Sequence, residues 1–193
     1  GPNPFRQARL LSAVDFVQPA ASPQIACGID GGNPMHAGPV APNQLITLFG
    51  VNLGPATGVV APDGLDSSIA GVSVTFDGNP AQLLYVSSSQ INVLTPASIT
   101  QNAATVMQVS VNGAAASPRQ FAITASNPNL FADLSQNGVN CFGAVQGLTP
   151  VANNTDGSRN SCSNPAKVGS IVSFYVHGIG SAACVSCFDV TVG

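Results

Sequence analysis

Apolar and polar positions recur in the same order at two places in this chain. The first copy covers residues 44–54 and the second covers residues 170–180, with apolar, hydroxyl and closing glycine positions in matching order. A strand-like run follows each copy, at residues 72–78 and 189–193. A repeat longer than about 100 residues indicates duplicated domains, because solenoid units are only about 20 to 50 residues long. We therefore expect two related units.

Short apolar runs predict the strands of the first unit. Asp77-Gly78 and Asn112-Gly113 supply the positive φ angles that two-residue hairpin turns need. Short strands that recur about every 8 to 12 residues are typical of a β-sandwich, so we expect an all-β, antiparallel sandwich. The predicted strands are residues 44–49, 71–76, 81–86, 91–95, 105–111 and 119–124.

The N-terminal pattern has two interpretations. Asn3-Pro4 resembles a helix start. Leu10, Val14 and Phe16, however, lie on one face of a strand, and we favour a strand over residues 9–17.

Glycine and proline dominate residues 19–43, which predicts a long loop. The strand rhythm changes after residue 128. Residues 130–134, 139–145 and 149–152 predict a small hairpin layer ahead of the second copy.

Composition supports strands and narrows the class of partner. Only 7% of the 193 residues are charged, against roughly 25% ordinarily; glutamate is absent and Lys167 is the single lysine. Long solvated helices are therefore not expected. A net charge of −3 with five basic residues argues against nucleic acid. Apolar runs such as 171–176 are too short for the roughly 20 residues of a membrane-spanning helix.

Five cysteines favour an oxidising compartment. Cys141 and Cys162 flank a predicted hairpin, whereas Cys27 lies alone in the predicted loop. Cys184 and Cys187 form a C-x-x-C pair, for which redox activity or zinc binding is the alternative to a disulfide. We favour structural disulfides among Cys141, Cys162, Cys184 and Cys187, and spacing leaves the pairing open.

No catalytic, cofactor-binding or metal-binding residues are expected. His36 and His177 have no catalytic or metal motif beside them, so each is interpreted as structural or exposed. Most of the eight aspartates stand at turns, and residues 153–160 favour a hairpin turn over a calcium loop. Tyr85 and Tyr175 are expected in the core, which disfavours an aromatic sugar platform.

Several segments together carry a family resemblance. They are residues 41–50, 71–74, 84–92, 154–158 and 164–170. In them the chain resembles the Ig-like, IPT/TIG-related domain found near the C-termini of large secreted acidobacterial (Solibacter-type) proteins. The resemblance runs from about residue 39 to 180. It implies an Ig-like sandwich, a secreted or cell-surface setting and a second such unit beginning near Ser170, with no catalytic residues to carry over.

These observations divide the chain into three parts. We expect an N-terminal strand and loop at 1–38, the Ig-like sandwich at 39–127, and the hairpin layer with the first strands of a second unit at 128–193. Two strands alone cannot bury a core, so we expect a strand from another copy to complete the second unit. The candidate assembly residues are Leu10, Val14, Phe16, Ile171, Phe174, Val190 and Val192.

The sequence therefore predicts a non-enzymatic, extracellular structural protein. Copies would pair strands into a homopolymer, as a surface filament or matrix, without cofactors and without a membrane span. The alternative is an Ig-like spacer, or a carbohydrate-binding or adhesion module of a larger secreted protein, with polysaccharide or matrix as partner.

Overall fold

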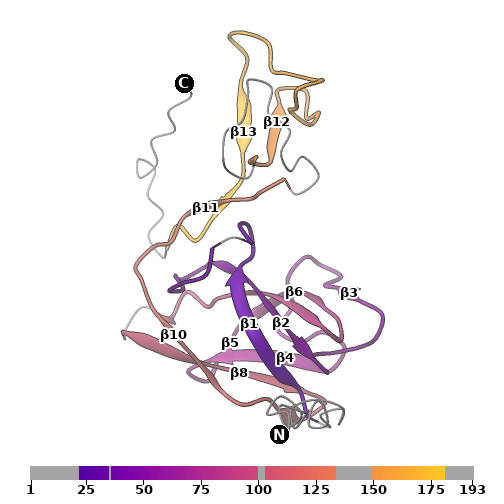
Figure 1. The fold of residues 1–193 in the computed structure, drawn as a ribbon, viewed down its shortest axis with the longest axis vertical. Helices are drawn as coiled ribbons and strands as arrows, with labels where there is room; N and C mark the ends of the chain where they lie inside the picture. Colours follow the sequence, from indigo (N-terminus) through magenta and orange to yellow (C-terminus); the bar gives the residue numbers. More distant parts are fainter. Residues whose placement is uncertain (1–21, 35, 100–102, 134–148, 181–193) are drawn as a thin grey trace, which may run out of the picture.

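Two antiparallel sheets pack face to face, and two short ribbons lie at one end of them (Figure 1). The structure is a computed structural model that describes residues 22–34, 36–99, 103–133 and 149–180. Within these ranges the regular elements are strands. The predicted fold class, an all-β antiparallel sandwich, is confirmed.

The first sheet has the strand order β1-β2-β7-β6-β3, and the second has the order β10-β8-β4-β5, with β9 also paired to β8. The strands of the first sheet are β1 (Gln24–Asp30), β2 (Leu45–Val51), β3 (Val59–Val60), β6 (Gln82–Val86) and β7 (Gln90–Leu94). Those of the second are β4 (Val72–Phe76), β5 (Asn79–Pro80), β8 (Ala104–Val111), β9 (Ala114–Ala115) and β10 (Arg119–Ala122).

Alternation of side chains along the strands builds the core. In β4 the odd-and-even pattern is clear, because every second side chain is buried and those between are half-buried. The inner face of β8 extends this layer in the same sheet, and the inner faces of β2, β6 and β7 supply the facing layer of the other sheet. The largest fully buried side chains include Leu48, Val74, Phe76, Leu83, Ile91, Val93, Met107 and Val109.

Both predicted hairpin turns are confirmed. Asp77 and Gly78 have φ angles of 49° and 80°, and they connect β4 to β5. Asn112 and Gly113 have φ angles of 50° and 84°, and they connect β8 to β9. Positive φ at both central residues is the turn geometry that matches the twist of paired strands.

The predicted loop over residues 19–43 is wrong for its central part. Residues 24–30 form β1, which pairs with β2 at the edge of the first sheet and carries a bulge between Ile25 and Cys27. Gly28 allows close packing here, because a Cβ atom would lie 3.2 Å from side-chain atoms of both Leu48 and Phe121, which is tighter than an ordinary contact. Gly28, which suggested a loop in the sequence, is therefore part of a strand. The domain boundaries at residues 38 and 127 stay a prediction.

The other expected strands of the sandwich occur within one or two residues of their predicted bounds. In the C-terminal part, β11 (Asn129–Leu130) pairs with β14 (Val176–His177), and β12 (Ala152–Asn154) pairs with β13 (Val172–Phe174). β11 is shorter than the predicted strand at 130–134, and β12 begins where the predicted strand at 149–152 ends. The predicted strands at 9–17 and 139–145, and the run at 189–193, lie outside the described residues.

The sequence repeat reappears as a repeat of strand pairing. Counting from the repeat, Phe174 occupies the position of Leu48. Leu48 of β2 pairs with Gly28 of β1, and Phe174 of β13 pairs with Ala152 of β12. The next two residue pairs of β12 and β13 match the next two pairs of β1 and β2. The pairs of β11 and β14 match those at the start of β1 in the same way. Together β11 and β12 therefore stand in the place of β1.

Backbone angles support this correspondence. Asn43 has a φ angle of 55°, and its counterpart Gly169 has 81°. Beyond the strand, Asn52 has a φ angle of 56° and its counterpart Gly178 has 71°. The left-handed residues that begin and end the repeated strand are thus kept in both copies, and the second unit reproduces the β1–β2 pair of the sandwich.

Truncation of Leu48 tests how much the buried face of β2 contributes. Leu48 is 0% exposed, so Leu48→Ala removes apolar contacts and leaves a cavity. We expect the free energy of unfolding to fall by about 3 kcal/mol in chemical denaturation. Val60→Ala, at a position 66% exposed on β3, is the matched control and should change it by less than about 0.5 kcal/mol. Equal losses in the two variants would contradict the assignment of Leu48 to the core.

Candidate functional site

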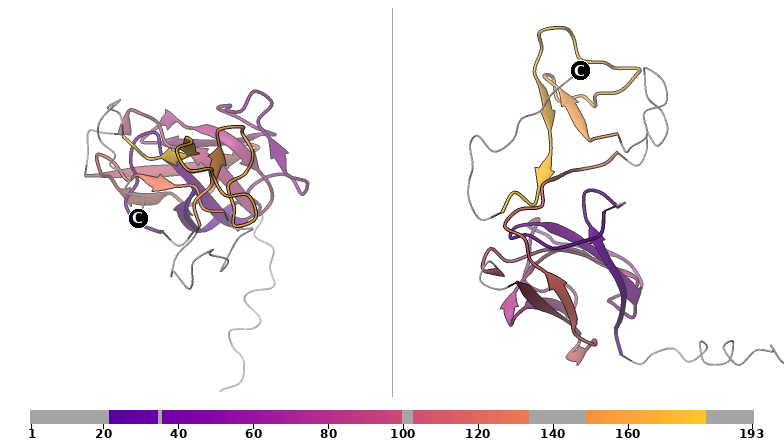
Figure 2. Two further views of the ribbon diagram at one scale, coloured as in Figure 1. Left: turned by 90° about the horizontal axis from the view of Figure 1, so that it is seen from above. Right: turned by 60° about the vertical axis from the view of Figure 1, so that its left-hand side comes forward.

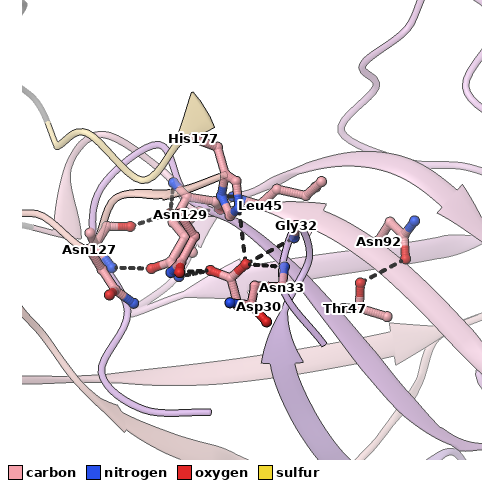
Figure 3. A network of polar contacts seen from close by, with 12 residues as sticks. Asp30, Gly32, Asn33, Leu45, Thr47, Asn92, Asn127, Asn129 and His177 are labelled. Carbon is pink, nitrogen blue, oxygen red and sulfur yellow. Dashed lines mark hydrogen bonds and ion pairs between the residues drawn. The ribbon is translucent and has the colours of Figure 1, made fainter. Parts of the chain in front are cut away.

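A cluster of buried polar side chains lies where the ribbons meet the sandwich (Figure 3). Asp30 ends β1, and Gln44 directly precedes β2. Asn129 begins β11, and His177 ends β14. The cluster therefore joins residues that are up to 147 positions apart in sequence. We call it the Asp30–His177 joint.

The carboxylate of Asp30 is the centre of the joint and is only 4% exposed. Its Oδ1 accepts hydrogen bonds from the backbone N–H groups of Gly32 (2.9 Å) and Asn33 (2.8 Å). Its Oδ2 accepts from the side-chain amides of Gln44 (2.7 Å) and Asn129 (3.1 Å). Both oxygens are thus satisfied by protein donors, which a buried carboxylate needs.

Hydrogen bonds define the tautomer of His177. The backbone N–H of Leu45 donates to Nδ1 of His177 over 3.1 Å, so Nδ1 is the acceptor nitrogen. Nε2 then carries the hydrogen and donates it to Oδ1 of Asp30 over 3.0 Å. The ring of Phe131 packs beside the imidazole, with 4.8 Å between ring centroids. A neutral, buried imidazole therefore bridges a carboxylate of β1 and the first amide of β2.

The hydrogen bonds also set the charge of Asp30. Burial by itself raises the pKa of the carboxyl group. Hydrogen bonds from His177, from Gln44 and from the N–H of Asn33 outweigh burial, so the pKa of Asp30 lies below its ordinary 3.8. Asp30 is thus a carboxylate at neutral pH.

Gln44 connects the joint to the sandwich. Its Oε1 accepts from the N–H of Ala41 (2.7 Å), while its backbone N–H donates to Oγ1 of Thr95 (2.9 Å). The hydroxyl of Thr95 in turn donates to the carbonyl oxygen of Ala41 over 2.6 Å. Because Gln44 is 2% exposed and has both ends of its amide engaged, it holds the carboxylate of Asp30 against the end of β2.

Gly32 lets the two parts of the chain approach closely. A Cβ atom there would lie 2.5 Å from Nε2 of His177 and 3.3 Å from the ring of Phe131. The carbonyl oxygen of Gly32 also accepts a 2.7 Å hydrogen bond from the N–H of Ala132. Backbone contact of this kind leaves little room for sliding between the ribbons and the sandwich.

The joint is built for attachment and not for a reaction. A carboxylate–imidazole pair can serve as a general base, but here both nitrogens of His177 and both oxygens of Asp30 are held by protein groups. The cavity beside Asp30 measures about 10 Å³, far below the roughly 300 Å³ at which ligand pockets begin. Within the described ranges, no group of three or more His, Cys, Asp or Glu side chains is arranged to hold a metal ion.

Comparison with known protein families agrees with this architecture. Residues 29–127, just over half of the chain, match the IPT/TIG domain family. The chain belongs to the IPT/TIG domain family. IPT/TIG domains are non-catalytic, Ig-like modules, consistent with a joint whose polar groups are all engaged. Among curated proteins, none matches the chain at a significant level. The acidobacterial subfamily stays a prediction.

The structure of this IPT/TIG chain places two of the predicted assembly residues on the second unit. Ile171 lies beside β13 and is 72% exposed, and Phe174 lies on β13 and is also exposed. Among the candidate disulfide cysteines, Cys162 is described and is disulfide-bonded, and Cys27 is a free, exposed thiol on β1. The remaining candidates lie outside the described residues, so their roles and the disulfide pairing stay predictions: Leu10, Val14, Phe16, Cys141, Cys184, Cys187, Val190 and Val192.

The structure also bears on the interpretation of residues 153–160 and of the two tyrosines. Residues 153–160 form a turn, with Gly157 donating to the carbonyl oxygen of Asn154 over 2.9 Å. Tyr85 is half-buried on β6, whereas the core position expected for Tyr175 is wrong, because its side chain is exposed beside the short β12–β13 ribbon. In the part of the chain that the structure describes, no helix is long and apolar enough to cross a membrane.

Sequence reasoning missed the joint. Asp30 lies in the Gly-rich stretch expected as a loop, and His177 has no motif that ties it to a partner. One signal was available in the repeat, where His177 replaces Val51 of the first copy. Val51 is exposed, and Asn154 of the second unit occupies the position that Asp30 has in the first unit. Neither residue of the Asp30–His177 pair is therefore repeated in the other unit.

Removal of the imidazole tests the joint directly. In His177→Ala the carboxylate of Asp30 and the N–H of Leu45 each lose a partner, so we expect about 2 kcal/mol less stability in chemical denaturation. The amide of Leu45 should exchange with deuterium at least about tenfold faster, whereas amides of β8 should not change. His36→Ala is the matched control, because the hydrogen bonds that the structure shows for His36 are made by its backbone and are kept in the variant. Unchanged exchange at Leu45 in His177→Ala would contradict the joint.

Titration of Asp30 predicts a pH dependence. Its pKa is lower in the folded chain than the ordinary 3.8, so its stabilising effect is present above about pH 4 and lost as pH falls through the folded value. We expect the difference in unfolding free energy between the unmodified chain and Asp30→Asn to be large above pH 4 and to shrink below it. Asp77 and Asp156 also have lowered pKa values, but both variants contain them, so their effects cancel. A difference that grows towards acid pH would contradict the assignment.

Proposed function

We propose that this chain is a non-enzymatic structural protein of the extracellular space, whose copies join into a surface filament or matrix by strand pairing at the second unit. The IPT/TIG family supports the non-catalytic, Ig-like part of the proposal. Few charges, a single lysine and five cysteines suit an oxidising setting outside the cell. The assembly itself is supported by one feature, the exposed apolar strand of the second unit.

That strand carries a row of large apolar side chains with little cover. In the corresponding strand of the sandwich, β2, Leu45, Ile46 and Leu48 are buried. Among the described residues, the same strand of the second unit belongs to two-stranded ribbons, which by themselves cannot form a core. Contiguous exposed apolar residues mark interaction sites in soluble proteins. The exposed residues are Ile171, Phe174, Tyr175, Val176 and Ile179.

Backbone groups support the same interpretation. β13 pairs with β12 on one side, and no strand of the described residues lies on its other side. An open strand edge presents N–H and C=O groups that pair readily with an extended segment. Strand addition combines those hydrogen bonds with contacts between side chains, and the exposed apolar side chains between residues 171 and 179 can make such contacts.

A second candidate function is a spacer between modules of a larger secreted protein. The Asp30–His177 joint is consistent with it, because a buried and fully hydrogen-bonded contact sets the angle between two units. Rigid attachment of this kind is useful to a filament as well, so the joint does not distinguish the two functions. The oligomeric state does.

Charge introduced on the apolar strand tests the proposed function. We expect the unmodified chain to form larger species with rising concentration in sedimentation velocity, and filaments or sheets in negative-stain micrographs. Phe174→Asp should raise the concentration needed for assembly at least about tenfold, because it places a carboxylate at the contact. Val60→Asp, which changes an exposed valine of the sandwich, is the matched control and should assemble normally. A monomer at all concentrations would contradict assembly and favour the spacer.

A further inference from the structure

We infer that the strand added to the second unit takes the place that β7 has beside β2, and that it is residues 9–17 of a second copy of this chain. The inference rests on the proposed function, and it names the partner, its direction and its register. Three observations carry it: the direction of the backbone groups of β13, the side-chain pattern of β7, and the reach of the N-terminal segment.

Hydrogen bonds of the sandwich show which edge is available. The N–H of Gly50 donates to the carbonyl oxygen of Ser89, and the N–H of Thr95 donates to that of Gln44. Even-numbered residues along β2 thus direct their backbone groups towards β7. Their counterparts in the second unit are also even-numbered, because the repeat spacing is even. The N–H and C=O groups of Val172 and Phe174 therefore point to the side of β13 on which no described strand lies.

Side chains of β7 define what the partner strand must look like. Ile91 lies opposite Leu48, and Val93 lies opposite Ile46; all four side chains are buried. Between them Asn92 lies opposite Thr47, whose hydroxyl is 3.2 Å from Oδ1 of Asn92. The pattern of the partner strand is therefore apolar, polar, apolar. It runs antiparallel to its neighbour.

The second unit presents the complementary positions. Phe174 stands in the place of Leu48, Ser173 in that of Thr47 and Val172 in that of Ile46. Val14, Asp15 and Phe16 match the pattern of β7, with a carboxylate where β7 has the amide oxygen of Asn92.

In antiparallel register Val14 meets Phe174, Asp15 meets Ser173, and Phe16 meets Val172. Each large side chain then faces a small one, which fills the space between the strands evenly. The hydroxyl of Ser173 can donate to the carboxylate of Asp15, as that of Thr47 donates to Asn92.

The length of the chain between Phe16 and β1 favours a segment from another copy. β1 rises through six residue steps from Gln24 to Asp30, or about 20 Å, and the strand from His177 to Val172 adds roughly 16 Å beyond the joint. Figure 1 shows β13 beyond the end of β1, on the side away from the start of β1, as does the right-hand view of Figure 2. The eight residue steps from Phe16 to Gln24 span at most about 28 Å. The chain's own segment therefore falls short of Val172, whereas a segment from a second copy has no such limit.

The test uses two full-length variants, each of which lacks one half of the contact. Val14→Asp with Phe16→Asp removes the donor side chains, and Phe174→Asp damages the acceptor. We expect each variant alone to stay monomeric at concentrations where the unmodified chain assembles. A mixture should form one-to-one dimers and nothing larger, because only one donor and one acceptor remain. Far-ultraviolet circular dichroism of both variants checks that the sandwich is folded.

Register is tested by cysteine cross-linking between copies. Counterparts of Asp15 and Ser173 in the sandwich, Asn92 and Thr47, form a non-hydrogen-bonded pair, in which Cα atoms are about 4.5 Å apart. Mixing Asp15→Cys with Ser173→Cys should therefore give an intermolecular disulfide, identified by mass spectrometry of the linked peptides. Ala13→Cys mixed with Ser173→Cys is the matched control and should cross-link at least about tenfold less.

The outcomes separate this inference from the proposed function. If the donor variant assembles like the unmodified chain, or if Ser173→Cys links to another segment such as β7 of a second copy, the inference is overturned while assembly stands. If the unmodified chain does not assemble at all, both are overturned. One-to-one complementation together with the Asp15–Ser173 cross-link supports both.

Discussion

The hydrogen-bonded pair of Asp30 and His177 is the contact on which the arrangement of this protein depends. The carboxylate and the imidazole of this pair are buried away from water. Their burial is tolerated because protein groups form hydrogen bonds with both carboxylate oxygens and both ring nitrogens. Gly32 makes the close approach possible, and Gln44 ties the carboxylate to the end of β2. Apart from this pair, the described contacts between this end of the chain and the sandwich are backbone hydrogen bonds and a few side-chain amides, such as those of Asn43 and Asn127. The joint thus turns two adjoining units into one oriented body.

Orientation matters because the second unit repeats only the first strand pair of an IPT/TIG sandwich within the described residues. Its β13 strand keeps the register and the flanking left-handed residues of β2, yet Phe174 is exposed and Val172 is only half-buried. No strand of the described residues lies on the second side of β13, so in this part of the chain the strand presents an open edge next to exposed apolar side chains. Those two properties are what strand addition requires. The joint presents this edge at a fixed end of the sandwich.

Sequence patterns predicted the sandwich well and the site poorly. Alternating runs such as 71–76 and 105–111, with Asn112-Gly113 and Asp77-Gly78 as turns, report local geometry, and they correspond to β4, β8 and their hairpins. β1 was missed because Gly28 and its neighbours suggested a loop. Its glycine serves close packing against Phe121 of the other sheet, which no local pattern shows. Asp30 and His177 were missed for a related reason, since their partnership spans most of the chain.

The amino-acid sequence by itself determined the class of fold, the strand rhythm and the duplication, because each follows from side-chain alternation and turn chemistry within a few residues. Tertiary structure alone decided that a glycine-rich stretch is an edge strand and that two predicted pieces, β11 and β12, together replace β1. It also decided that a histidine without a motif is buried against an aspartate. These features depend on which distant segments meet, and a contact between distant segments is set by packing of the whole chain.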